Sequence, residues 1–321
     1  MGHQVTVIGT VFIDCKGAAQ ANYHAQGRNL GSIQFVHGGV GRNVAENMAG
    51  LGLTVSFVSS VDGNGIGMEV IDRLKRADIH TEYVAVSPEK GMGMWLVILD
   101  EKGNMAGSIS QMPDLTAMER MIADKADTFI ESSSHIVLEL DLHEALTNQI
   151  LERAAKHRKP VYGIPGNLDV ILKKPECLSE LECFICNNHE ADRLIDAGFS
   201  SLSIEQMQGK LSEYVAASGI RSMVVTLGAE GSIYYDGRTN SSGYQPVFPV
   251  SLVDSSGAGD AFFSGTVMGL VRGLPLGEAV ICGTKTAGWT IGTMESTCSD
   301  LKDKMASDEA MSALLATVAP T

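Results

Sequence analysis

The chain has 321 residues, of which 44% are apolar and 19% are charged, and its formal net charge at pH 7 is −14. This composition fits one large α/β domain, or one domain with a small appendage, and it excludes a disordered chain. The negative charge argues against nucleic acid or an anionic membrane as the main partner, because either requires a basic surface. It does not exclude ATP, since backbone N–H groups and a metal ion can build a phosphate site inside an acidic protein.

No apolar run reaches the about 20 residues that a transmembrane helix needs. The first 12 residues carry neither the basic segment nor the cleavage-site pattern of a signal peptide. We therefore expect a soluble, cytoplasmic protein with no membrane partner.

Six cysteines are spaced irregularly along the chain, which argues against a disulfide framework: Cys15, Cys177, Cys183, Cys186, Cys282 and Cys298. Cys183 and Cys186 form a C-x-x-C pattern, but no second pair of metal ligands accompanies them. We interpret these two residues as small core residues at the end of a strand.

In the first part of the chain, short apolar runs alternate with amphipathic segments. Val5–Ile8 predicts a buried strand, and residues 39–52 open with glycines and continue with apolar residues at helical spacing. Val55–Val58 predicts the next strand, and Ile66–Arg76 predicts a second helix. This order is typical of a parallel sheet with right-handed crossovers.

Two segments depart from this rhythm. Residues 11–37 are small, polar and rich in glycine, with no helical pattern, and residues 92–110 alternate around a turn at 100–104, as a β-hairpin does. We expect about 11–37 and 92–112 to form a small β sheet beside the main domain. This small sheet could serve as a lid over a substrate cleft or as a contact between subunits of an oligomer. The two roles are compatible.

From Leu115 onward the α/β rhythm returns, and helices fill most of the gaps between strands. Five further strands are predicted, at Ile136–Leu140, Val161–Ile164, Cys183–Cys186, Ser222–Leu227 and Ser232–Tyr235. There is no internal repeat and no linker to a second domain, so residues 1–321 are predicted to form a single domain.

The clearest chemical pattern is the segment 254–263, DSSGAGDAFF, in which a glycine-containing turn runs into an apolar, helix-compatible stretch. A helix N-terminus offers unpaired N–H groups and the positive end of the helix dipole, so residues 257–259 can form an anion hole for a phosphoryl group. Asp260, in the first turn, can accept the proton of an attacking hydroxyl. An Asp that caps a helix after a glycine turn fits the spacing equally well.

This segment resembles the D-[ST]-x-G-A-G-D-x-F signature of the PfkB, or ribokinase-like, family of carbohydrate and nucleoside kinases. Three more motifs occur in the family's order, namely GGVGRNVA at 38–45, the N-x-x-E motif NNHE at 187–190, and TLGAEG at 226–231. The resemblance covers nearly the whole chain. It implies a three-layer α/β fold with a central, mostly parallel sheet and a small β lid, and an ATP-dependent kinase activity. The P-loop pattern G-x-x-x-x-G-K-[ST], which marks another class of ATP-binding proteins, does not occur.

The family motifs imply roles for individual residues. Asp260 would be the catalytic base, and the anion hole would be formed by Gly257, Ala258 and Gly259. The residues implied to bind ATP and its phosphates are Asn187, Glu190, Thr226, Gly228, Gly231, Gly283 and Thr284. Those implied to hold the sugar hydroxyls of the acceptor are Asp14, Gly39 and Asn43.

The resemblance also implies metal ions. Glu190 would hold Mg²⁺ through water, as suits an ion that keeps much of its hydration shell. Asp254 and Ser256 match positions that often hold a monovalent cation in the family, which makes K⁺ a candidate activator.

For the acceptor, the Arg that precedes Asn43 and the hairpin around Trp95 look most like the pseudouridine kinase branch, whose substrate is phosphorylated on the 5′-hydroxyl. Phe12 and Ile164 depart from that pattern, since relatives often carry polar residues there, and Phe12 could instead face a base. Glu139 or Asp141 could add an acceptor contact, and the sequence does not choose between them.

The alternatives are a ribokinase- or fructokinase-type sugar kinase and a non-catalytic sugar- or nucleoside-binding regulator on the same fold. A homodimer through the lid is a further expectation from the resemblance.

Overall fold

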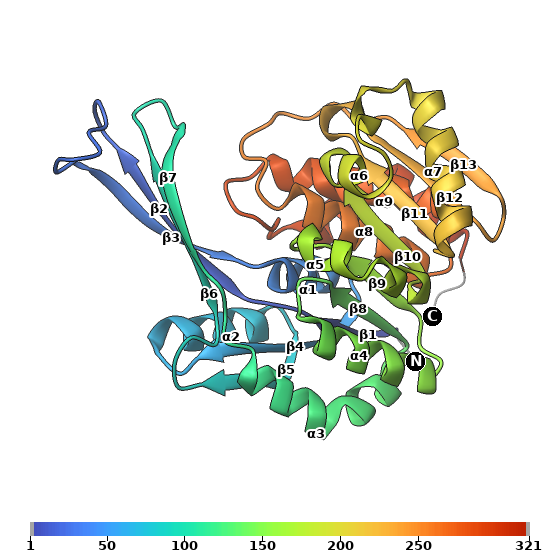
Figure 1. The fold of residues 1–321 in the computed structure, drawn as a ribbon, viewed down its shortest axis with the longest axis horizontal. Coiled ribbons are helices and arrows are strands. Elements are labelled where there is room, and N and C mark those ends of the chain that lie inside the picture. Colours follow the sequence, from blue (N-terminus) through green and yellow to red (C-terminus); the bar gives the residue numbers. More distant parts are fainter. Residues whose placement is uncertain (1–2, 319–321) are drawn as a thin grey trace.

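A large central sheet dominates the protein, in a computed structural model that describes residues 3–318 (Figure 1). Within these residues the sheet has nine strands in the order β13-β12-β11-β10-β9-β8-β1-β4-β5. All run parallel except β12, which is antiparallel to both of its neighbours. The strands are β1 (Gln4–Ile8), β4 (Thr54–Asp62), β5 (His80–Ser87), β8 (His135–Glu139), β9 (Val161–Ile164), β10 (Cys183–Asn187), β11 (Ser222–Thr226), β12 (Ser232–Asp236) and β13 (Ser241–Gln245).

Helices cover both faces of this sheet and give the protein three layers (Figure 1). Apolar residues of α1, α2, α8 and α9 pack against one face, and those of α3, α4 and α7 pack against the other. The helices are α1 (Val40–Gly50), α2 (Gly65–Arg76), α3 (Thr116–Ser132), α4 (Glu144–Lys156), α5 (Leu168–Lys173), α6 (Asn188–Leu194), α7 (Ile204–Ser218), α8 (Ala258–Val271), α9 (Leu276–Ile291), α10 (Leu301–Ser307) and α11 (Glu309–Ala316). The predicted α/β class with a mostly parallel central sheet is confirmed.

The strands of the centre are rich in apolar residues because both of their faces are buried. In β1, Val7 belongs to the core on one side of the sheet and Ile8 to the core on the other. The same alternation separates Cys183 from Cys186 in β10, since their side chains pack on opposite faces. This explains the C-x-x-C spacing, and all six cysteines are unpaired.

A second sheet of four strands, in the order β3-β2-β6-β7, projects from the main body (Figure 1). It consists of β2 (Phe12–Ala19), β3 (Gly31–Gly38), β6 (Gly93–Leu99) and β7 (Met105–Gln111). These are the two segments that the sequence assigned to a small sheet. We call this sheet the lid sheet, and it leaves the main body after the carboxyl ends of β1 and β5.

Two strands of the central sheet, β5 and β13, were not anticipated. Both lie at its edges, where one side of the strand has no partner. Edge strands tolerate polar residues. β13 reads SSGYQ and has no apolar run, and β5 reads HTEYVAVS, in which the apolar residues YVAV follow three polar ones.

No helix within residues 3–318 is long and apolar enough to span a membrane.

Candidate active site

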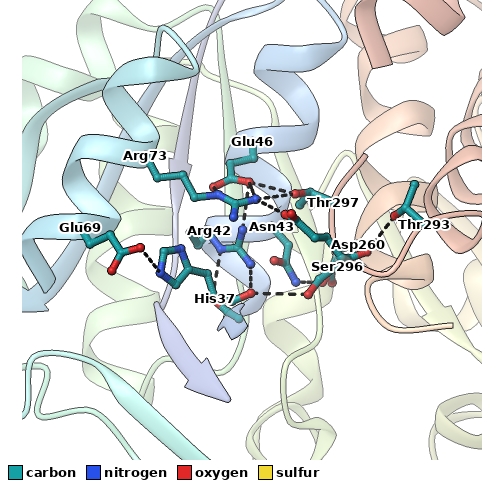
Figure 2. A network of polar contacts seen from close by, with 12 residues as sticks. His37, Arg42, Asn43, Glu46, Glu69, Arg73, Asp260, Thr293, Ser296 and Thr297 are labelled. Carbon is teal, nitrogen blue, oxygen red and sulfur yellow. Dashed lines mark hydrogen bonds and ion pairs between the residues drawn. The ribbon is translucent and has the colours of Figure 1, made fainter. Parts of the chain in front are cut away.

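The predicted acceptor residues gather where α1 begins, at the carboxyl end of β1. Gly39 precedes the helix with φ 94°, and a side chain there would come within 2.6 Å of the carbonyl oxygen of Thr10. Only glycine allows this backbone conformation and this close approach together. One turn into the helix, the Nδ2 of Asn43 donates a hydrogen bond of 2.7 Å to Oδ2 of Asp260 (Figure 2). Residues that are 217 positions apart in the chain thus meet in one site.

The predicted anion hole lies at the N-terminus of α8. Gly257 adopts φ 75°, and a side chain at this position would lie 2.0 Å from the carbonyl oxygen of Ser296. The turn before it is fixed by the carboxylate of Asp254, which accepts a hydrogen bond of 2.8 Å from the N–H of Ser256. Gly259 is open to space, with nothing within 4 Å of where a side chain would begin. An anion can therefore approach the start of α8 beside Gly259, while the N–H of Ala258 also donates to the Ser255 carbonyl at 3.2 Å.

Asp260 is partly buried beside this hole. Burial raises the pKa of its carboxyl from 3.8 to about 6, and the hydrogen bond from Asn43 and the positive charge of Arg42 oppose the rise. A carboxylate with this pKa is largely ionised at neutral pH and is more basic than an exposed aspartate. The geometry and the charge suit a general base.

Asp14 lies on β2, at the end of the lid sheet nearest the main body. Its carboxylate oxygens come within about 3 Å of where a side chain at Gly38 would begin, so glycine makes room for it. Burial raises the pKa of Asp14, and the charges of Lys16 and Arg42 oppose this. The charge of Arg42 therefore acts on both Asp14 and Asp260.

Glu139 ends β8 and Asp141 lies two residues beyond it, but their surroundings differ. The carboxylate of Glu139 is 2% exposed and accepts hydrogen bonds from the N–H of Thr10 at 2.7 Å and the N–H of Gly41 at 3.0 Å. It thereby joins the start of α1 to the end of β1. Burial raises the pKa of Glu139 to about 8, although these donors lower it. Asp141 is half-buried, with its pKa raised by burial to about 6, and it makes no hydrogen bond to the residues that the structure describes.

A cavity of about 540 Å³ adjoins the anion hole, since Ala258 and Gly259 form part of its lining. Four residues predicted to bind the nucleotide line it, together with two of the anion hole: Thr226, Gly228, Gly231, Thr284, Ala258 and Gly259. Its remaining wall is apolar and includes residues 247–250, Leu252 and Ile291. This segment was not predicted to belong to the site because it has no regular structure, and its only signal is an apolar run, VFPV, outside any predicted strand or helix.

Gly283, which the resemblance placed near the adenine, does not line this cavity. A side chain there would come within 2.1 Å of the Oγ1 of Thr266 and 2.6 Å of the carbonyl oxygen of Phe262. It therefore lies where α8 and α9 pack closely, and its small size serves that contact.

Asn187 and Glu190 form a reciprocal capping box at the start of α6. The Asn187 side chain accepts from the N–H of Glu190 at 2.9 Å, and the Glu190 carboxylate accepts from the N–H of Asn187 at 2.8 Å. β10 pairs with β11 so that Asn187 lies opposite Thr226, which places the motif at the same edge of the sheet as the cavity. Only one carboxylate oxygen of Glu190 is used in the box, so the other can accept a water of a hydrated Mg²⁺ ion.

The chain is similar over most of its length to proteins of known family and structure. The family described as pfkB family carbohydrate kinase matches residues 3–303. A guanosine-inosine kinase of Exiguobacterium acetylicum is 35% identical over 92% of this chain and 96% of its own, and a pseudouridine kinase of Escherichia coli is 27% identical over 86% of each. A ribokinase of Arabidopsis thaliana, solved in complex with ribose and ATP, superposes with a TM-score of 0.81 over 98% of this chain and 99% of its own, at 19% identity. The fold is ribokinase-like.

Proposed function

We propose that the chain, which belongs to the pfkB family of carbohydrate kinases, transfers the γ-phosphoryl group of ATP to the 5′-hydroxyl of a ribonucleoside. A purine nucleoside is the first candidate for this acceptor. That the protein is a sugar or nucleoside kinase follows from the family. The nucleotide, the acceptor and the residue roles below are our proposal.

One observation carries the proposal, namely the place of Asp260. On one side it adjoins the amides of the anion hole, which line the cavity of about 540 Å³, and on the other it accepts a hydrogen bond from Asn43 of α1. A base in this position can take the proton of a hydroxyl held beside α1, while the amides of residues 257–259 stabilise the charge of the phosphoryl group in transit.

The nucleotide site supports the same arrangement. The apolar wall of the cavity suits a purine base, and Thr226, Gly228 and Gly231 suit the phosphates and ribose. Asn187 and Glu190 would hold a hydrated Mg²⁺, which neutralises charge on the phosphates when bound. Asp254 and Ser256 have oxygen atoms that K⁺ could use, and its contribution is part of the test below.

The acceptor would lie between the lid sheet and α1, with its sugar hydroxyls on Asp14 and Asn43 and the backbone at Gly39. The ring of Phe12 lies at the base of the lid sheet, where a side chain at Gly93 would come within 2.3 Å of it. An aromatic ring there can pack against a nucleobase. Together with the 35% identity to a guanosine-inosine kinase, this favours a purine nucleoside. Pseudouridine, the acceptor predicted from the sequence, is the second candidate and is supported by the 27% identity to a pseudouridine kinase.

ADP release from Mg-ATP tests the proposal, against a panel of guanosine, inosine, adenosine, pseudouridine, uridine, ribose and fructose, with and without K⁺. We expect the highest kcat/KM with a purine nucleoside. A preference for pseudouridine would replace the first candidate with the second, and a preference for ribose or fructose would leave only the kinase chemistry. A folded protein that binds these ligands but releases no ADP would favour the non-catalytic regulator.

The homodimer through the lid also stays a proposal. The lid-sheet face opposite Asp14 exposes apolar side chains on two strands, with Ile33 73% and Ile109 69% exposed. Sedimentation of the protein and of an Ile33→Ser/Ile109→Ser variant would test it, since loss of the apolar face should shift a dimer toward monomer.

A further inference from the structure

A buried arginine lies immediately beside the site but outside the roles assigned above. The side chain of Arg42 is 1% exposed, and its Nη1 lies 2.9 Å from Oε2 of Glu46, one turn further along α1. Its Nε and Nη2 donate to the backbone carbonyls of Gly38 and His37, where lid strand β3 ends (Figure 2). One guanidinium thus joins the end of the lid sheet to α1.

Glu46 extends this contact to two other parts of the protein. Its carboxylate, 8% exposed, accepts two hydrogen bonds from Arg73 of α2, at 2.8 and 3.0 Å. It also accepts a hydrogen bond of 2.9 Å from the hydroxyl of Thr297, which lies in the loop after α9 (Figure 2). The carboxylate therefore has three partners from different elements, and its pKa is lowered by its charged neighbours despite burial.

The loop that contains Thr297 supports the anion hole. The carbonyl oxygen of the preceding residue, Ser296, lies where a side chain of Gly257 would be, so loop and hole are in direct contact. The Ser296 hydroxyl also donates to the His37 carbonyl at 3.5 Å, the same carbonyl that Arg42 contacts. A path of polar contacts thus runs from the end of the lid sheet through α1 to the loop at residues 296–297, and this loop packs directly against Gly257 of the anion hole.

The polar contacts among Arg42, Glu46 and Thr297 suggest a role beyond stabilising the core. The loss of hydration of both charges offsets the attraction within a buried ion pair, and replacing such a pair with apolar residues of similar volume is often neutral or stabilising. What a guanidinium adds is geometry, because its planar set of donors fixes several acceptors at once, and a lysine cannot reproduce this.

We propose that Arg42, Glu46 and Thr297 are positioning residues that hold the anion hole in register with α1 and with the end of the lid sheet. They touch neither ATP nor the acceptor in the arrangement proposed above, and they act through Ser296 and the His37 carbonyl. This inference rests on the proposed phosphoryl transfer at Asp260.

Thr297→Val is the first test, because it removes one hydroxyl, introduces no charge and leaves the Arg42–Glu46 pair in place. We expect kcat to fall about tenfold or more while KM for ATP changes by less than about threefold, since misplacing a reacting group by about 1 Å can have such effects. Thr239→Val, a matched change in the exposed turn between β12 and β13, should leave both constants unchanged. Arg42→Lys should lower kcat as well, and the double variant with Thr297→Val should be no slower than Arg42→Lys alone, because both changes break the same path.

Amide hydrogen exchange of the ligand-free protein gives a readout that does not depend on turnover. Thr297→Val should speed exchange at residues 254–259 and 36–39 together, and leave β11 unchanged. Wild-type kcat together with wild-type exchange at 254–259 in this variant would overturn the inference. If the wild-type protein phosphorylates nothing in the panel, the proposed function fails, whereas the exchange experiment still decides whether the path holds the anion hole.

Discussion

Replacing Asp260 with Asn separates what the residue contributes to catalysis from what it contributes to stability. The amide keeps the shape of the carboxyl, and its oxygen can still accept the hydrogen bond that Asn43 donates. The variant cannot accept a proton from the acceptor hydroxyl. We expect kcat to fall by about 10²–10⁴-fold, which corresponds to about 3–5 kcal/mol of transition-state stabilisation.

The same substitution should make the protein more stable at neutral pH. The pKa of Asp260 rises from 3.8 to about 6 on folding, so the folded state binds the proton more tightly than the unfolded state does. The stability that this group contributes is present below pH 4 and is lost as pH rises through about 6. At 1.36 kcal/mol for each pKa unit, the ionised carboxylate costs about 3 kcal/mol at pH 7.5. Asn avoids this cost, so the variant should gain up to that amount at pH 7.5 and progressively less toward pH 5.

Two measurements test this pair of effects, namely ADP release under saturating substrates and urea unfolding at pH 5 and pH 7.5. The reasoning is refuted if the folded variant turns over at the wild-type rate, because Asp260 is then not the base. It is equally refuted if the variant is less stable than the wild type at pH 7.5, because burial of the charge is then not what raises the pKa.

Substitutions at three further positions test the surrounding geometry. Gly257→Ala forces an alanine to φ 75° and places its Cβ 2.0 Å from the Ser296 carbonyl oxygen; we expect about 1–2 kcal/mol of backbone strain and, from displacement of the anion hole, a fall in kcat of about 10²-fold, measured by thermal unfolding and ADP release. Asn43→Ala removes a hydrogen bond that lowers the pKa of Asp260, so the acidic limb of the kcat profile should move above pH 6, and an unmoved limb would contradict the assignment. Glu139→Ala leaves two buried backbone N–H groups unpaired and should lower the free energy of unfolding by about 2–5 kcal/mol. Glu139→Gln, which retains an acceptor for them, should lower it far less in the same urea titration.

Much of the site could be predicted because its motifs are local. The GAGD turn and the N-terminus of α8 need only a few consecutive residues, and the role of a helix N-terminus follows from the unpaired amides that every helix has. The central strands could be predicted for a similar reason, since strands buried on both faces are continuous apolar runs. The edge strands β5 and β13 carry more polar residues, which an edge position tolerates, and β13 has no apolar run at all.

What only the tertiary structure decided depends on contacts between distant segments. From the sequence, Glu139 and Asp141 were equally good candidates for an acceptor contact. In the folded protein, the carboxylate of Glu139 instead accepts hydrogen bonds from the backbone N–H groups of Thr10 and Gly41. It placed Gly283 in a helix contact and brought an irregular apolar segment into the nucleotide cavity.

Arg42 shows the same division. By itself it is one cation in a helix, and only the fold makes it a buried link between the lid sheet, α1 and, through Glu46, the loop that contains Thr297. The burial of a residue and its hydrogen-bond partners depend on how the whole chain packs. The sequence alone predicts only the interactions that form within short segments.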